Sequence, residues 1–268
     1  MTWLNLLKPE GFVLFTLVLT RVSGLTMTAP IYGTREIPMQ VRGLLAFALA
    51  LLITPTQCHV AVQYPGNLPQ YAVLLAAELL MGLCLGLGIV ILVGGVQLAG
   101  EMIGYVSGLM LADVLDPSTE TNVPLFSRLM FLVTIAVFVC IGGHRIVMAG
   151  LLDTFASIPP GSGAVPDSIA QTFVTLLAQS FNLGIRAAMP VVTALLLATL
   201  MMGLIARTLP QLNVLVLGFG LSAMLTLAML SLTLGAAAWA FQEQVEPALE
   251  TILEALHAPL RSQWLRAP

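Results

Sequence analysis

The residues of this chain that most often bind metals or act as nucleophiles are few and scattered. It has three histidines and three cysteines, none of them clustered: His59, His144, His257, Cys58, Cys84, Cys140. An odd number of cysteines at these spacings predicts neither a disulfide framework nor a zinc site. Asp113 and Asp116 could form a carboxylate pair, but the Asp116-Pro117 step favours a turn. No HExxH, GxSxG or glycine-rich phosphate-loop pattern occurs, so we expect no enzyme activity and no cofactor.

Several charged residues lie in or beside apolar runs. Arg21 falls near the middle of the first run, where an arginine costs about 2.5 to 3.5 kcal/mol on insertion scales, so it should face protein and not lipid. We expect the same of Glu101. Arg186, Arg207 and Glu78 are interpreted as marking helix ends, from which long side chains reach the membrane interface.

Two rows of residues with the same spacing run along one predicted helix around Glu101. Small residues recur every four positions, at Gly100, Gly104, Gly108 and Ala112, which lets another backbone approach closely. The adjacent row is polar and consists of Gln97, Glu101 and Tyr105. The two rows predict a seam between subunits. An internal helix pair of the same chain would need the same spacing and remains the alternative.

The composition excludes a water-soluble globular protein. Of 268 residues, 58% are hydrophobic and only 9% are charged, and the mean hydropathy is +0.98. A formal net charge of -3 offers no basic surface for nucleic acid. We therefore expect lipid and other apolar proteins as partners.

Apolar runs of about 20 residues, each able to cross a bilayer as a helix, predict an all-α membrane protein. About six hydrophobic helical segments are expected, with a more polar helix at 164–186. The six segments cover residues 11–33, 43–54, 79–100, 129–152, 187–206 and 208–242. The last two are expected to form a helical hairpin whose turn contains Arg207, Pro210, Gln211 and Asn213. Residues 243–268 are expected to form an amphipathic acidic tail.

Three stretches of the sequence resemble the flagellar biosynthetic protein FliR family, and the similarity extends over nearly the whole chain. They read RVSGLTMTAPIYGTREIPMQVRGLLAFALALLITP at 21–55, VQLAGEMIGYVSGLMLADVLDPSTETNVPLFSRL at 96–129, and GLIARTLPQLNVLVLGFG at 203–220. The ARTLPQLN stretch looks more like the flagellar branch than the related virulence (injectisome) branch, which stays the alternative.

The resemblance implies a non-enzymatic subunit of the type III protein export gate, located in the bacterial inner membrane at the flagellar basal body. It implies assembly with FliP-like and FliQ-like subunits, docking to FlhB and FlhA, and passage of unfolded exported proteins. Residues 1–186 would be FliP-like and 187–242 a FliQ-like hairpin, in a hetero-oligomeric ring of tilted helical hairpins. Arg21 and the seam would then face neighbouring subunits.

The resemblance also implies a loop that plugs the central pore, between residues 108 and 124. Its candidate residues are Gly108, Asp113, Asp116, Pro117, Ser118, Thr119, Glu120, Thr121, Asn122 and Pro124.

Two other function classes compete with export. A self-contained ion or solute transporter could use Arg21, Glu101 and Asp113 as a relay. It should, however, show two halves of similar pattern with matched broken helices, and the sequence does not. An intramembrane hydrolase would need a nucleophile and base pair that the sequence does not offer.

Overall fold

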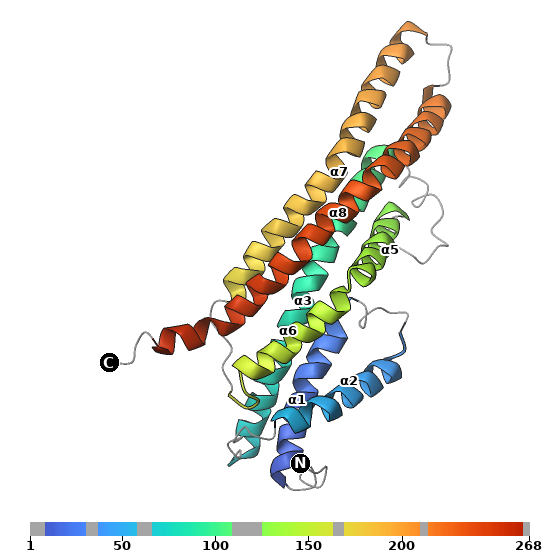
Figure 1. Cartoon of the computed structure of the whole chain (residues 1–268). Coiled ribbons are helices and arrows are strands. Elements are labelled where there is room, and N and C mark those ends of the chain that lie inside the picture. Colours follow the sequence, from blue (N-terminus) through green and yellow to red (C-terminus); the bar gives the residue numbers. More distant parts are fainter. Residues whose placement is uncertain are drawn as a thin grey trace. The chain divides into compact units, whose positions relative to one another are not determined.

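The computed structural model describes residues 9–30, 37–57, 66–108, 125–162, 169–209 and 214–264. Every regular element in these ranges is helical, which confirms the all-α fold (Figure 1). Within the described ranges, five helices are long and apolar enough to cross a membrane, or six spans if α5 and α6 count as one broken span, as the sequence predicted. The elements are α1 (Pro9–Thr28), α2 (Met39–Ile53), the 3-10 helix η2 (Thr54–Gln57), α3 (Leu68–Ser107), α5 (Leu125–Cys140), α6 (Gly143–Ser157), α7 (Ile169–Thr208) and α8 (Val214–Trp264).

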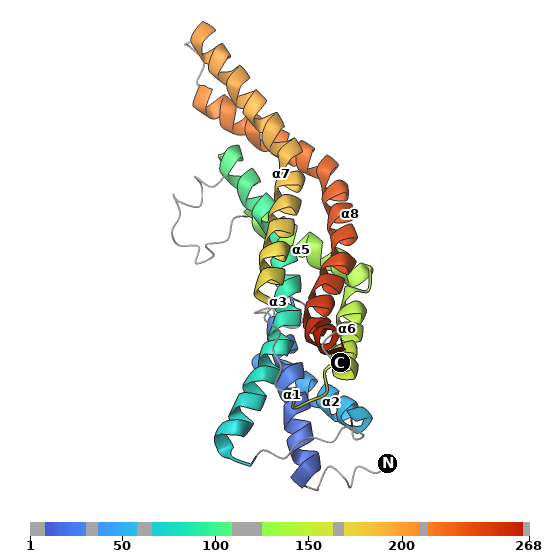
Figure 2. The ribbon, with the colours of Figure 1, turned by 90° about the vertical axis from the view of Figure 1, so that its left-hand side faces the viewer.

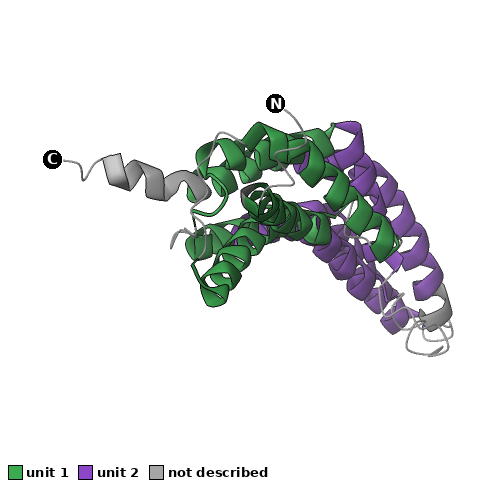
Figure 3. Ribbon diagram, turned by 90° about the horizontal axis from the view of Figure 1, so that it is seen from below, with its two compact units in different colours: residues 1–90, 142–176, 245–268 green, residues 91–141, 177–244 purple. Residues whose placement is uncertain are grey.

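The chain forms two compact units, coloured separately in Figure 3. Unit 1 contains residues 1–90, 142–176 and 245–268, and unit 2 contains residues 91–141 and 177–244. The long helices α3, α7 and α8 contribute residues to both units. These units do not test the division at residues 186 and 242 that the resemblance implies, and that division stays a prediction.

Close backbone contact between α1 and α3 shapes unit 1. A Cβ atom added at Gly24 would lie 2.7 Å from the carbonyl oxygen of Leu79, and one added at Gly82 would overlap the carbonyl oxygen of Arg21. Only glycine allows this approach, as in other small-residue helix contacts of membrane proteins. On α1, Phe15 also packs edge-to-face against Phe47 of α2, with ring centroids 5.5 Å apart.

The second half of α3 makes similar contacts within unit 2. A Cβ atom at Gly184 of α7 would overlap the carbonyl oxygen of Gly95, and Ser180 Oγ donates a hydrogen bond of 2.6 Å to the carbonyl oxygen of Ile91. Within this unit α7 and α8 run antiparallel as a hairpin (Figure 1 and Figure 2). The hairpin is therefore held to α3 through glycine and serine on α7.

Two expected boundaries are wrong. Residues 129–152 were predicted to be one span, but the chain breaks between α5 and α6 because Gly142 adopts the left-handed conformation, with φ of +74°. Conversely, the described part of the polar segment, residues 169–186, and the span 187–206 form one continuous helix, α7, which accommodates Pro190 in its interior. Arg186 therefore does not end a helix, whereas Arg207 lies in the last turn of α7.

Candidate functional site

The most specific polar arrangement among the described residues is a buried ion pair in unit 1. Arg21 of α1 and Glu78 of α3 are both completely buried, and Arg21 Nε donates a hydrogen bond of 2.6 Å to Glu78 Oε2. Glu78 was expected at a helix end, but α3 begins at Leu68, so the carboxylate lies inside the helix. A buried arginine needs a counter-charge, and Glu78 supplies it.

The pair also binds the backbone that follows α6. Arg21 Nη1 donates to the carbonyl oxygens of Thr154 and Ile158, at 3.1 and 3.0 Å. Glu78 Oε1 accepts a hydrogen bond of 2.8 Å from the backbone N–H of Gly161. The last turn of α6 and the residues after it are thus attached to α1 and α3 through one guanidinium and one carboxylate.

An aromatic ring completes the surroundings of the guanidinium. Arg21 Cζ lies 4.4 Å from the centroid of the Phe155 ring, in cation–π contact. Phe155 is itself buried. Of the guanidinium nitrogens, Nη2 has no hydrogen-bond partner among the described residues. The cluster has one acid and one cation and no nucleophile, so its chemistry is that of a structural charge pair.

The partners of Arg21 correct one expectation. The resemblance implied that Arg21 faces a neighbouring subunit, but its side chain is completely enclosed by its own chain. The sequence did not reveal that Glu78, Thr154 and Ile158 are partners of Arg21, or that Gly161 binds Glu78. One signal was present for Glu78, because it is the acidic residue directly before the charge-free run 79–100 and opposite in sign to the lone arginine of the first span.

The two rows predicted as a seam lie in different surroundings. A Cβ atom at Gly100 would lie 2.5 Å from the carbonyl oxygen of Phe126 in α5, so at Gly100 the structure shows the internal helix pair that the spacing left open. Gly104 is buried and Gly108 half-buried. In the polar row, Gln97 and Glu101 are half-buried and Tyr105 is 68% exposed. A contact with another subunit at these positions stays a prediction.

Most of the predicted plug and hairpin turn lies outside the described residues. Gly108 is described, with φ of +75°, and Arg207 is described at the end of α7. The remaining predicted plug and turn residues are Asp113, Asp116, Pro117, Ser118, Thr119, Glu120, Thr121, Asn122, Pro124, Pro210, Gln211 and Asn213. Within the ranges that the structure does describe, no three histidine, cysteine or acidic side chains come together as metal ligands would.

Comparison with known proteins agrees with the resemblance. The family described as "Bacterial export proteins, family 1" matches residues 12–248. Flagellar biosynthetic protein FliR of Bacillus subtilis (strain 168) is 32% identical over 226 residues, covering 82% of this chain and 85% of that protein. The protein of the same name from Escherichia coli (strain K12) is 31% identical, covering 83% of this chain and 81% of that protein. The one from Aquifex aeolicus (strain VF5) is also 31% identical, with coverage of 82% and 86%.

Proposed function

Because the chain belongs to family 1 of the bacterial export proteins, we propose that it helps form the channel through which unfolded flagellar proteins cross the cell membrane. At the coarser level it is a membrane subunit of the flagellar export apparatus and a structural component of it. The proposal adds the channel, the bacterial inner membrane at the basal body as its location, and FliP-like, FliQ-like, FlhB and FlhA partners.

The observation that carries the proposal is the uncovered apolar surface of the α7–α8 hairpin. In their most apolar stretches, 61% of α3 is buried but only 17% of α7 and of α8. Large side chains such as Leu200, Met224 and Leu232 are each at least two-thirds exposed. Contiguous apolar surface of this kind marks a contact with lipid or with another apolar protein.

The length of α7 favours cover by protein for part of that surface. The helix has 40 residues and is therefore about 60 Å long, whereas the hydrocarbon core of a bilayer is about 30 Å thick. A helix of twice that length extends beyond the hydrocarbon. Its apolar side chains there would face water unless other subunits covered them. Neighbouring hairpins in a ring would supply such cover.

Purification of the tagged chain from its own cells in a mild detergent tests the proposal. We expect it to co-purify with two small membrane proteins that each span the bilayer several times, and we expect a strain lacking it to stop exporting flagellar axial proteins. A monomer or homodimer that transports an ion or solute after reconstitution would contradict the channel role and support the transporter alternative.

A further inference from the structure

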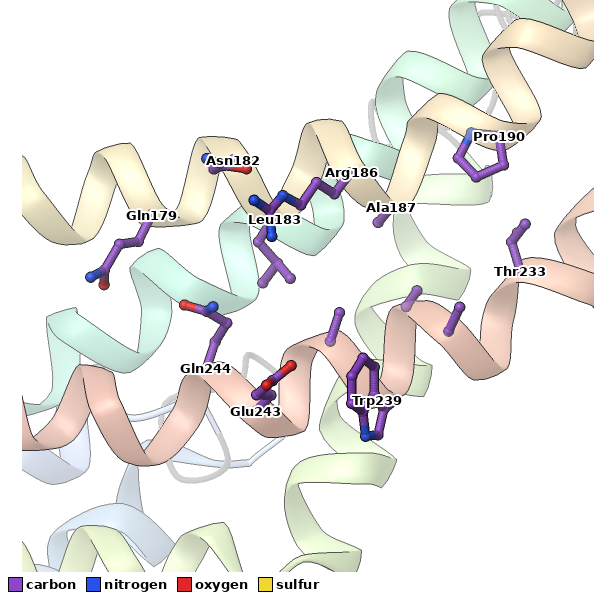
Figure 4. Close-up of a pocket in the computed structure, with 13 residues that line it drawn as sticks. Gln179, Asn182, Leu183, Arg186, Ala187, Pro190, Thr233, Trp239, Glu243 and Gln244 are labelled. Carbon is purple, nitrogen blue, oxygen red and sulfur yellow. The ribbon is translucent and has the colours of Figure 1, made fainter.

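A groove between α7 and α8, within unit 2, carries two charges of opposite sign. Its volume is about 390 Å³, and Arg186 contributes from α7 while Trp239, Glu243 and Gln244 contribute from α8. Figure 4 shows Leu183 and Gln244 extending into the space between the two helices, with Arg186 on α7 and Glu243 on the facing helix α8. The groove thus carries charged and amide side chains within a lining that is otherwise mostly apolar.

Three polar side chains of this groove have no partner among the described residues. Among the residues that the structure describes, neither Arg186 nor Glu243 makes an ion pair or a hydrogen bond. Gln179, on the same side of α7, has a buried side-chain oxygen with no hydrogen-bond donor. Because buried acceptors are normally satisfied, an occupant of the groove should supply an N–H or O–H donor there.

An apolar hollow adjoins the groove at Arg186 and Pro190. It begins at Arg186 and follows α7 along Met189, Pro190 and Leu197. Arg186 and Glu243 bound the stretch 187–242, which contains the turn of the hairpin. Arg207, near the turn, is the only charged residue in that stretch. Trp239 lies at the groove and is 66% exposed, as is typical of tryptophan where apolar and polar layers meet. The apolar hollow therefore adjoins the cation and not the anion, which lies on the facing helix.

We propose that this groove binds the headgroup of a zwitterionic phospholipid with a primary ammonium group, such as phosphatidylethanolamine. Arg186 would bind the phosphate through charge-assisted hydrogen bonds. The ammonium group would donate to the carboxylate of Glu243 and to the side-chain oxygen of Gln179. The acyl chains would follow the apolar surface from Met189 to Leu197, so the phosphate, which is nearer to them than the ammonium group, would meet the cation that adjoins the apolar hollow.

The charges of the groove distinguish among lipids. With one cation and one anion, it suits a zwitterion better than an anionic phospholipid, whose phosphate would also approach Glu243. Phosphatidylcholine has the same net charge but no N–H, so it cannot donate to Gln179 or Glu243. This lipid site goes beyond the channel proposal and does not depend on it.

Native mass spectrometry of the purified, delipidated full chain tests the site. Short-chain phosphatidylethanolamine, phosphatidylcholine and phosphatidylglycerol would be added separately. We expect phosphatidylethanolamine to bind about tenfold more tightly than the other two, and Arg186→Gln and Glu243→Gln each to remove about tenfold of that affinity. Equal affinity for the three lipids, or unchanged binding by both variants, would overturn the proposal.

Matched controls separate the groove from general effects of charge and of folding. Arg207→Gln on α7 and Glu250→Gln on α8 change exposed charges outside the groove and should leave binding unchanged. Ala240→Phe fills the groove without changing any charge and should abolish the preference for phosphatidylethanolamine. This variant decides the result if a charge variant loses its helical circular dichroism.

A neighbouring protein is the competing occupant. Asn182 is exposed and lines the groove, so Asn182→Cys reports what lies against it in the native assembly. Crosslinking to another polypeptide, with no phosphatidylethanolamine retained in that assembly, would show that a polar side chain of another subunit occupies the groove and would refute the lipid site.

Discussion

Removing Glu78 from the buried ion pair should destabilise the fold of the chain itself. Glu78→Leu leaves the Arg21 guanidinium completely buried and without a counter-charge, and it also removes the acceptor of the Gly161 N–H. Breaking one partner of a buried pair costs about 3 to 5 kcal/mol. The two carbonyl oxygens bound by Nη1 and the Phe155 ring remain, but they do not neutralise the charge.

A double-mutant cycle gives the prediction its sharpest form. Arg21→Met should cost a similar amount, because it leaves the carboxylate buried. The double variant, Arg21→Met with Glu78→Leu, buries no charge and loses only hydrogen bonds to the backbone and the cation–π contact with Phe155. Thr154 loses little, since its carbonyl oxygen also accepts the N–H of Ile158 at 2.8 Å. We therefore expect the double variant to cost less than the sum of the single variants by about 2 kcal/mol or more.

Urea unfolding of the full chain in a mild detergent, followed by circular dichroism, measures these free energies. Glu101→Leu is the matched control, because it makes the same change on the same helix at a half-buried position, and it should shift the free energy of unfolding by about 0.5 kcal/mol at most. Additive single variants, or a Glu78→Leu protein as stable as the control, would refute the argument that the pair is a coupled, buried unit.

Three further predictions concern packing, accessibility and the pore. Gly82→Ala should lower the free energy of unfolding by about 1 to 3 kcal/mol, because its methyl group would overlap the backbone of α1. Gly94→Ala, with nothing within 4 Å, should be neutral or stabilising in the same urea assay. Equal effects of the two variants would contradict the close helix contact. In a Cys58→Ser background, maleimide should label Cys140, which is exposed, and not the buried Cys84, as read by mass spectrometry, and equal labelling rates would be incompatible with the packing of α3. Deleting residues 118–122 should make cells permeable to small dyes without loss of assembly, and wild-type permeability of an assembled deletion variant would exclude a plug there.

Helix identity could be predicted from the sequence because the apolar runs match the thickness of a bilayer. Helix boundaries could not always be predicted, because a charged residue beside an apolar run can lie inside a long helix as well as at its end. Arg186 and Glu78 both lie inside long helices. The charge of Glu78 is neutralised by its buried partner Arg21, and the side chain of Arg186 is exposed. Neither charge therefore interrupts the backbone hydrogen bonds of its helix.

Of the ion pair, the burial of Arg21 could be predicted from the sequence, but its partner could not. The cost of a central arginine in an apolar helix indicated that Arg21 faces protein. Its partner is 57 positions away, and its other contacts are backbone carbonyls, which every residue carries and which leave no mark in a sequence. Contacts of this kind follow from how the helices pack, and spacing along one helix does not reveal them.

The break at Gly142 has a consequence for the sidedness of the chain. α5 and α6 have 16 and 15 residues, so each is about 24 Å long or less and too short to cross the hydrocarbon alone. If each of the five spanning-length helices among the described residues crosses once, α1 and α8 begin and end on the same side when the broken pair also crosses, and on opposite sides when it turns back. Whether the chain crosses or turns back at this left-handed glycine thereby decides which compartment receives the acidic end of α8, about a hundred residues further along the chain.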